Sequence, residues 1–384
     1  MTTPRTLLAA VTAAVALSLS AAASSRPEAP EGRLVAIADV HGAGGAFVKI
    51  LQRTGLIDEQ QKWIGGSAVF VQTGDLLDRG TEIKPVLDLL MALESQASAA
   101  GGRVQVLLGN HEGITMLGET RDAAQDVYRA FADEKSESRR EQGFQAAKKI
   151  AKGTTLDKDK DAWMAAHPPG YIEYRDAFAP NGRYGKWLRG KPVVVEIDGT
   201  VFMHGGINPT SAPDPLDAIN KRARQDLSEW DRGLKWLIQH DLALPFSTLQ
   251  EIVAAASDEY ARLAARAKAD GTLSGDAAAA EAILPIVNVA ASTFVNSEGP
   301  VWFRGYSTWT DEEGAPLMEG LLKKYKVKRF ITGHTPQPSG RIGVRFNNTL
   351  YLIDTGMLDG KFYPNGRPSA VEIKGDVVTP VYVE

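Results

Sequence analysis

Residues 69–80 read VFVQTGDLLDRG, and this stretch predicts the architecture around it. Its first part, Val69–Gln72, is apolar and rich in β-branched residues, as in a strand that is buried on both faces of a sheet. A glycine turn follows at once and carries Asp75, Asp78 and Arg79. Ligand sites in α/β folds collect at the carboxyl ends of strands, so the stretch predicts a site at the end of a buried strand.

The same arrangement occurs four more times along the chain. In each case an apolar run ends and a glycine-bearing turn follows: Asp39-Val40-His41-Gly42, Gly109-Asn110-His111-Glu112, His204-Gly205-Gly206 and Gly333-His334-Thr335. Four of the six histidines lie in these turns, whereas His167 and His240 lie in helical stretches and are expected to be surface or packing residues. Five loops of this kind can converge on one point although they are far apart in the sequence.

The side chains in these turns suit a pair of divalent metal ions. Imidazole, carboxylate and amide oxygen favour Mn, Fe or Zn. Two such ions about 3.5–4 Å apart can share a hydroxide and stabilise both oxygens of an in-line displacement at phosphorus. The chain has no cysteine, so thiolate ligands, disulfides and a cysteine nucleophile are all excluded. The residues alone therefore predict two-metal hydrolysis of a phosphate ester.

The remaining sequence predicts an α/β fold. Short apolar runs indicate strands, and they occur at Leu34–Ala38, Ala68–Gln72, Val104–Leu108, Val193–Ile197, Val201–Met203, Arg329–Thr332 and Leu350–Ile353. Asp198-Gly199 predicts a hairpin between two of them, and residues 370–383 predict another. Apolar residues at 3- and 4-residue spacing predict a helix over Ile83–Ala99. We interpret residues 33–384 as one catalytic domain with helical insertions at about 119–190 and 215–290.

The first residues differ in character from the rest. Residues 1–23 combine one arginine, an apolar alanine-rich run and small residues, which is typical of a secretory signal peptide. Residues 24–32 (SSRPEAPEG) read as a linker. The alternative is an uncleaved anchor, but the run is short and alanine-rich for a bilayer span. We therefore expect an exported protein, periplasmic or secreted, without stable membrane insertion. The net charge of −4 does not indicate the basic surface that proteins use to bind nucleic acid.

The ordered motifs D-x-H-G, G-D-x-x-D-R-G, G-N-H-E, H-G-G and G-H-T resemble the signature of the phosphoprotein phosphatases in the calcineurin-like metallophosphoesterase superfamily. With Gly299–Gly305 (GPVWFRG), the chain is most similar to the bacterial Shewanella-like branch. The resemblance covers most of Arg33 to Met357 and breaks at the helical insertions. It implies a central mixed β-sandwich flanked by helices, two divalent ions, and a phosphoprotein or phosphopeptide substrate, with either phosphotyrosine or phosphoserine and phosphothreonine as the target.

The resemblance also implies roles for ten residues. One metal ion would be held by Asp39, His41 and Asp75, and the second by Asp75, Asn110, His204 and His334. His111 would be the general acid and Asp78 the carboxylate that orients it, while Arg79 and Arg304 would bind the phosphate. Glu112 and Thr335 would support these residues.

Two departures from the family pattern bear on these roles. Ala38 stands where many relatives carry glycine, and the residues around Arg304 lack the pattern of the eukaryotic serine/threonine enzymes. Two other functions remain open at this point. One is a small-molecule enzyme on the same scaffold, such as a dinucleoside polyphosphate hydrolase or a phosphodiesterase. The other is a catalytically dead scaffold, which would be expected to have lost ligands that this chain retains.

Overall fold

The computed structural model describes residues 32–123, 125–150, 159–270, 277–358, 360 and 362–383. The expected signal peptide at 1–23 and nearly all of the expected linker at 24–32 lie outside these residues.

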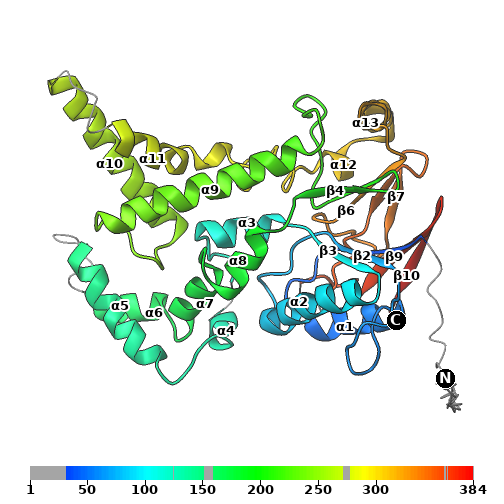
Figure 1. The fold of residues 1–384 in the computed structure, drawn as a ribbon, viewed down its shortest axis with the longest axis horizontal. Coiled ribbons are helices and arrows are strands. Elements are labelled where there is room, and N and C mark those ends of the chain that lie inside the picture. Colours follow the sequence, from blue (N-terminus) through cyan, green and yellow to red (C-terminus); the bar gives the residue numbers. More distant parts are fainter. Residues whose placement is uncertain are drawn as a thin grey trace, which may run out of the picture.

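Two five-stranded mixed sheets form the centre of the fold (Figure 1). The first has the order β10-β9-β1-β2-β3, with β1 (Arg33–Ile37), β2 (Val69–Gln72) and β3 (Arg103–Val106) parallel. The antiparallel hairpin of β9 (Ser369–Lys374) and β10 (Val377–Tyr382) completes it. The predicted second hairpin at the C-terminal end is therefore confirmed.

The second sheet has the order β4-β5-β6-β8-β7. β5 (Thr200–Met203), β6 (Arg329–Thr332) and β8 (Leu350–Leu352) are parallel. β4 (Val194–Ile197) and β7 (Gly343–Arg345) pair antiparallel at the two edges. β5 and β6 are buried at every residue, as their apolar sequences predict.

The alternation of side chains along the strands accounts for the layers. In and after β1, Leu34, Ala36 and Ala38 belong to the apolar cluster that includes Phe202 and Ile331 of the second sheet. The intervening Val35 and Ile37 instead join the larger core, with helix residues. Because successive side chains point to opposite faces of a strand, one run fills both the space between the sheets and the space under the helices. The predicted sandwich flanked by helices is confirmed.

Helices near the strands cover the sheets and position the loops. They are α1 (Gly44–Arg53), α2 (Ile83–Ala99), the short α3 (Asn110–Leu117), α12 (Gly305–Thr308) and α13 (Asp311–Tyr325). The predicted helix over Ile83–Ala99 agrees with α2 at both ends. All eight residues of α3 are buried, so this helix runs through the interior between the sheets and the remaining helices.

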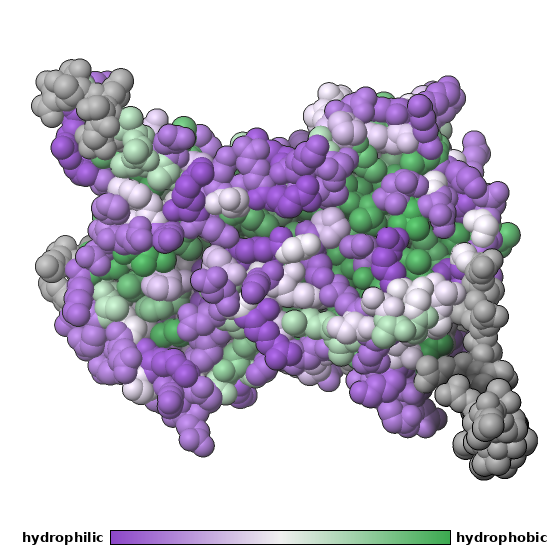
Figure 2. Space-filling model, in the orientation of Figure 1, coloured by the Kyte–Doolittle hydropathy of each residue, from purple (hydrophilic) through white to green (hydrophobic). Residues whose placement is uncertain are grey.

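The other helices form two arms that extend away from the sheets (Figure 1). One contains α4 (Gln125–Arg129), α5 (Ser136–Ile150), α6 (Lys160–Ala166), α7 (Tyr171–Phe178) and α8 (Arg183–Arg189), and the other contains α9 (Ala218–Gln239), α10 (Leu249–Asp270), α11 (Ala277–Val287) and a 3-10 turn at Val289–Ala291. Figure 2 shows hydrophobic surface in the gap between the arms. No helix among the described residues is both long and apolar enough to cross a bilayer.

Candidate metal centre and active site

The five motif loops meet at one place in the structure. They follow the carboxyl ends of β1, β2 and β3 in the first sheet and of β5 and β6 in the second. The eight motif side chains that the sequence analysis assigned to metal binding or acid catalysis are all buried, none with more than 5% of its surface exposed: Asp39, His41, Asp75, Asp78, Asn110, His111, His204 and His334. The buried polar cluster thus lies at the carboxyl ends of strands from both sheets.

Asp75 lies at the centre of the cluster. Its Oδ2 is 3.2 Å from Nε2 of His204, 3.6 Å from Nε2 of His41 and 3.8 Å from Nε2 of His111. Two groups of potential metal-binding side chains share this carboxylate. The first contains His41 and His111, and the second contains His204 and His334. This arrangement supports the bridging position expected for Asp75.

The other expected ligands lie beside the same atoms. Oδ1 of Asn110 and Nδ1 of His334 are 2.9 and 3.1 Å from Nε2 of His204. Oδ1 of Asp39 accepts a hydrogen bond from the main chain of His334 at 3.0 Å. Oδ2 of Asp39 lies 3.9 Å from Nε2 of His41. The structure therefore brings together all six predicted ligands.

Each ligand histidine is oriented by a main-chain carbonyl. These contacts join His41 Nδ1 to Leu77 O at 2.8 Å, His204 Nδ1 to Thr73 O at 3.1 Å, and His334 Nε2 to Trp302 O at 3.0 Å. A hydrogen bond of this kind places the proton on the outer nitrogen and directs the lone pair of the other nitrogen into the cluster. Burial would lower the pKa of His204, but Asp75 and Asp39 raise it to about 9. Histidine binds metals as the neutral imidazole, so an ion bound here would displace that proton.

The charges in the cluster fit divalent cations. Burial raises the pKa of Asp39, and the nearby Asp75 adds to the rise. Burial alone would also raise the pKa of Asp75, but attraction to His204 and His111 outweighs it and holds that pKa well below its usual range. Two adjacent buried carboxylates are unfavourable without compensating charge, and divalent ions would supply it. The donor set of imidazole, carboxylate and amide oxygen suits Mn, Fe or Zn.

His111 and Asp78 form a pair at the edge of the cluster. Nδ1 of His111 is 2.6 Å from Oδ2 of Asp78. Burial would lower the pKa of His111, but Asp75 and Asp78 together raise it to about 9. A carboxylate bonded to one ring nitrogen holds a proton on the imidazole, and the second nitrogen is then free to donate it. His111 also lies within the first group of potential metal-binding side chains, but its bond to Asp78 favours the acid role.

Two arginines approach the cluster from different loops. The guanidinium of Arg79 lies against Nε2 of His41 at 2.7 Å and Nε2 of His111 at 3.2 Å. Nη1 of Arg304 donates to the carbonyl of His334 at 3.2 Å and to Oγ1 of Thr335 at 3.1 Å. Within the described part of the chain Arg304 pairs with no carboxylate. Both cations are therefore placed beside the ligands rather than in surface ion pairs.

Three more residues reach the site: Tyr363 and Asp354, which the motifs did not predict, and Glu112, which was predicted only as a supporting residue. Nη1 of Arg79 donates a hydrogen bond to the hydroxyl of Tyr363, which comes from the loop before β9. Asp354 is 2% exposed, and its Oδ2 has no hydrogen-bond partner among the described residues. Glu112 is fully buried and accepts hydrogen bonds from main-chain amides of two ligand loops. Neither Tyr363 nor Asp354 belongs to one of the five motifs, so no local pattern signalled them.

Glycines permit close contact between the loops. A Cβ at residue 109 would lie 2.2 Å from Oδ1 of Asp75, and a Cβ at residue 333 would lie 2.3 Å from Oδ1 of Asp39. Only glycine fits at these two positions, as expected where the main chain approaches a carboxylate. Five site residues that are not glycine adopt positive φ angles, namely His41 (46°), Asp75 (57°), Asp78 (65°), Arg79 (65°) and His334 (69°). Such backbone strain is typical of functional sites.

The two remaining histidines lie away from the cluster, as predicted. His167 is buried and stacks on Trp163, with 3.9 Å between the ring centroids. His240 is exposed and stacks on Trp236 at the same distance. Both therefore pack against aromatic rings.

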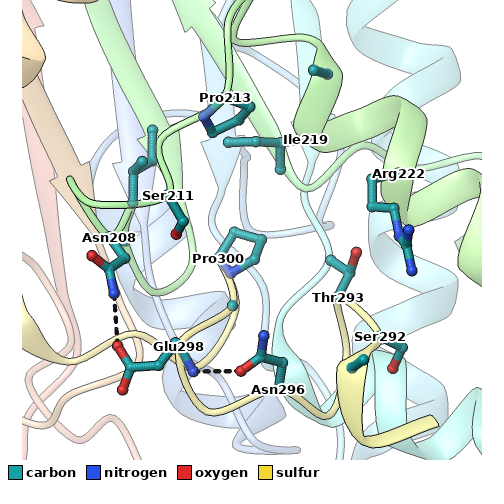
Figure 3. A pocket seen from close by; sticks show the side chains of 15 residues that line it. Asn208, Ser211, Pro213, Ile219, Arg222, Ser292, Thr293, Asn296, Glu298 and Pro300 are labelled. Carbon is teal, nitrogen blue, oxygen red and sulfur yellow. Dashed lines mark hydrogen bonds between the residues drawn. The ribbon is translucent and has the colours of Figure 1, made fainter. Parts of the chain in front are cut away.

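A cavity of about 250 Å³ lies beside the loop that carries His204 (Figure 3). Gly206 and Asn208 form part of one wall, and Glu298 and Pro300 part of another. Nδ2 of Asn208 donates to Glu298 at 2.8 Å across this space. The main chain of Pro300 also accepts hydrogen bonds from residues 205 and 206. There is thus space near the cluster for a group larger than a phosphate.

Known proteins resemble this chain over most of its length. Residues 32–278 match the family model described as calcineurin-like phosphoesterase. The chain is 28% identical to Shewanella-like protein phosphatase 2 of Arabidopsis thaliana, over 94% of this chain and 81% of that protein. It is 25% identical to Shewanella-like protein phosphatase 1 of Plasmodium berghei (strain Anka), over 87% and 70% respectively.

A solved structure has a similar fold. The cold-active protein-tyrosine phosphatase of a psychrophile Shewanella sp. superposes with a TM-score of 0.52 at 22% sequence identity. The match covers 92% of this chain and 80% of that one. It supports the two-sheet architecture with its helical additions.

Proposed function

Because the chain belongs to the calcineurin-like phosphoesterase family, we propose that it is a metal-dependent phosphoprotein phosphatase that hydrolyses phosphomonoesters. The observation that carries the proposal is the position of Asp75, whose Oδ2 is shared by the two groups of potential ligands. The acid pair of His111 and Asp78 lies directly beside it. The curated relatives named above are Shewanella-like protein phosphatases.

In this function the six ligands would hold two divalent ions, one on Asp39, His41 and Asp75 and the other on Asp75, Asn110, His204 and His334. Such ions lower the pKa of water toward neutrality and stabilise charge on phosphoryl oxygens. We propose Mn, Fe or Zn, since the donor set suits each of them.

The side chains of the protein would orient the phosphate and move one proton. Arg79 and Arg304 present planar guanidinium groups that match the oxygens of a phosphoryl group. Water attacks phosphorus opposite the ester oxygen, so one P–O bond forms as the other breaks. His111 donates the proton of its Nε2 to the departing oxygen, while Asp78 stabilises the imidazole in its protonated form. The phosphoryl group passes directly to water, without a phosphoenzyme.

We propose that phosphotyrosine is a substrate alongside phosphoserine and phosphothreonine. A phenolate is a better leaving group than an alkoxide, so its departure depends less on His111. The cavity beside Asn208 and Glu298 offers space for a side chain next to the phosphorylated residue.

We also propose export, on the composition of residues 1–23 alone. An alkaline-phosphatase fusion to this segment would test it: no activity outside the cytoplasm would contradict export.

The function is tested by hydrolysis of matched phosphotyrosine, phosphoserine and phosphothreonine peptides by the full chain, with Mn²⁺ and with a chelator. Diadenosine tetraphosphate is the comparison substrate and Asp75→Asn the control protein. Metal-dependent release from the peptides, absent in the variant, would support the phosphatase. Activity only on the nucleotide would replace the substrate by a small molecule. No activity on either would favour the scaffold.

A further inference from the structure

A second cavity, of about 590 Å³, lies between α3, α7 and α9. In the view of Figure 1, α9 lies above α3, α7 and α8. The cavity contains none of the predicted metal ligands or phosphate-binding residues. It nevertheless touches α3, because Thr115 and Met116 line it and Asn110 and His111 form the other end of that helix. Its volume falls within the range of roughly 300–1,000 Å³ that is usual for small-molecule sites.

A buried arginine forms part of the wall of this cavity. Arg175 of α7 is 6% exposed. Its Nη1 donates to the carbonyl of Thr115 at 3.2 Å and its Nη2 to the carbonyl of Ser247 at 3.1 Å. Among the described residues, its Nε has no hydrogen-bond partner and Arg175 belongs to no ion pair. A buried cation without a carboxylate partner is unfavourable, and an anion that reached it would be bound strongly.

The charges around the cavity point to the same kind of ligand. Among the described residues that line it, four are cationic (Arg175, Arg189, Arg232 and Lys235) and one, Asp231, is a carboxylate. Asp231 is already engaged by Arg189, through bonds of 2.7 and 2.9 Å. Arg232 and Lys235 form no ion pair within the described part of the chain. This cationic lining contrasts with the net charge of −4 of the whole chain.

The rest of the lining is largely apolar. Met116 comes from α3, Phe178 from α7, and Leu234 and Ile238 from α9. An apolar cavity with one buried cationic group suits a ligand that has an apolar body and a single negative head group.

We propose that this cavity is a binding site for an amphipathic monocarboxylate, with the carboxylate on Arg175 and the hydrocarbon against Phe178, Leu234 and Ile238. Arg175 contributes its buried Nε–H and its charge, and the apolar side chains select a hydrocarbon body. The site is separate from the proposed phosphatase centre, so it does not depend on that proposal.

Calorimetric titration of the full chain with decanoate tests the site, with decanol and decylamine as probes of equal chain length. We expect decanoate to bind and the other two to bind at least ~10-fold more weakly, a difference of about 1.4 kcal/mol in binding free energy. Asp75→Asn should bind decanoate like the wild type, which separates this cavity from the metal centre. Equal affinity for decanoate and decanol, or no binding of decanoate, would overturn the proposal.

Two variants distinguish the two parts of the site. Arg175→Met should weaken decanoate binding ~10-fold or more by removing the charge. Because Arg175 also bonds the end of α3, the second variant leaves it in place: Ile238→Trp fills the apolar part of the cavity and should likewise weaken binding. Gln225→Trp, at an exposed position of the same helix, is the matched control. If Ile238→Trp and Gln225→Trp bind decanoate equally well, the proposed location is wrong.

Discussion

Replacing Glu112 by glutamine tests whether one buried side chain holds two of the ligand loops together. Oε2 of Glu112 accepts hydrogen bonds from the main chain of Asp75 and of Gly109, both at 2.8 Å. Oε1 accepts from Leu76 at 2.7 Å and from Leu77 at 3.3 Å. A glutamine keeps one acceptor oxygen and places an NH₂ group where the other was. In either orientation of the amide, two main-chain N–H groups then face a donor.

The magnitude follows from these lost acceptors. An unsatisfied buried donor costs about 1–3 kcal/mol, so two cost about 2–6 kcal/mol. The buried negative charge of Glu112 is itself unfavourable, since burial and the nearby Asp75 raise the pKa of Glu112 to about 7. Removing this charge therefore offsets part of the loss. We therefore expect Glu112→Gln to lower the free energy of unfolding by about 2–4 kcal/mol. Metal affinity should also fall, by roughly 10–100-fold, because Asp75 is held through its own main-chain amide.

Urea unfolding of the metal-free full chain at about pH 8, where Glu112 is mostly ionised, measures the first effect. Titration with Mn²⁺ measures the second. Glu298→Gln is the control, since that side chain is exposed and should change stability by less than about 0.5 kcal/mol. A loss below about 1 kcal/mol for Glu112→Gln would refute the reasoning, because the four amides would not depend on the carboxylate.

Four further predictions concern single side chains. His111→Asn should retain its metal ions and lose kcat by ~100-fold or more, as expected for a general acid; full activity on phosphoserine peptides would contradict the role. Asp75→Asn should lose both ions in elemental analysis, and retention of a full complement would exclude a bridging carboxylate. Tyr363→Phe should raise KM for phosphopeptides about 2–10-fold, because Arg79 loses an acceptor that orients it; an unchanged KM would show that this bond has no such role. Burial lowers the pKa of His167 in the folded protein below its unfolded value of 6.5. The stability that the neutral side chain contributes is therefore complete above pH 6.5 and is lost as the pH falls from 6.5 through the folded pKa. The Tm of the wild type should therefore fall more between about pH 7 and pH 5 than that of His167→Phe, and equal falls would count against this assignment.

The parts of the fold that local patterns encode were predictable from the sequence. Helix α2 has apolar residues at regular spacing, and β6 is an uninterrupted buried run, so both were located to the residue. The edge strand β7 (Gly343–Arg345) was missed because it has three residues and no fully buried one. Short edge strands owe their structure to the neighbouring strand, here β8, rather than to their own composition.

The site residues also divide into those that a local pattern predicts and those that depend on contacts between distant segments. The ligands were predictable because each follows its own strand within a glycine turn. Tyr363 was not, because its contact with Arg79 joins residues 284 positions apart and depends on how the loop before β9 folds back. The cavity around Arg175 likewise needs α3, α7 and α9 to be in place, and no segment alone indicates it.

The left-handed backbone at His41, Asp75, Asp78, Arg79 and His334 has a consequence for how such a protein can change under selection. A residue with a Cβ costs about 1–2 kcal/mol in this conformation, and glycine largely avoids that cost. Directed evolution for heat resistance alone would therefore favour glycine at the very positions that the proposed chemistry requires. A screen that selects for thermal stability without measuring turnover is expected to yield stable but inactive variants. Variants of this enzyme are best enriched with both criteria applied in the same round.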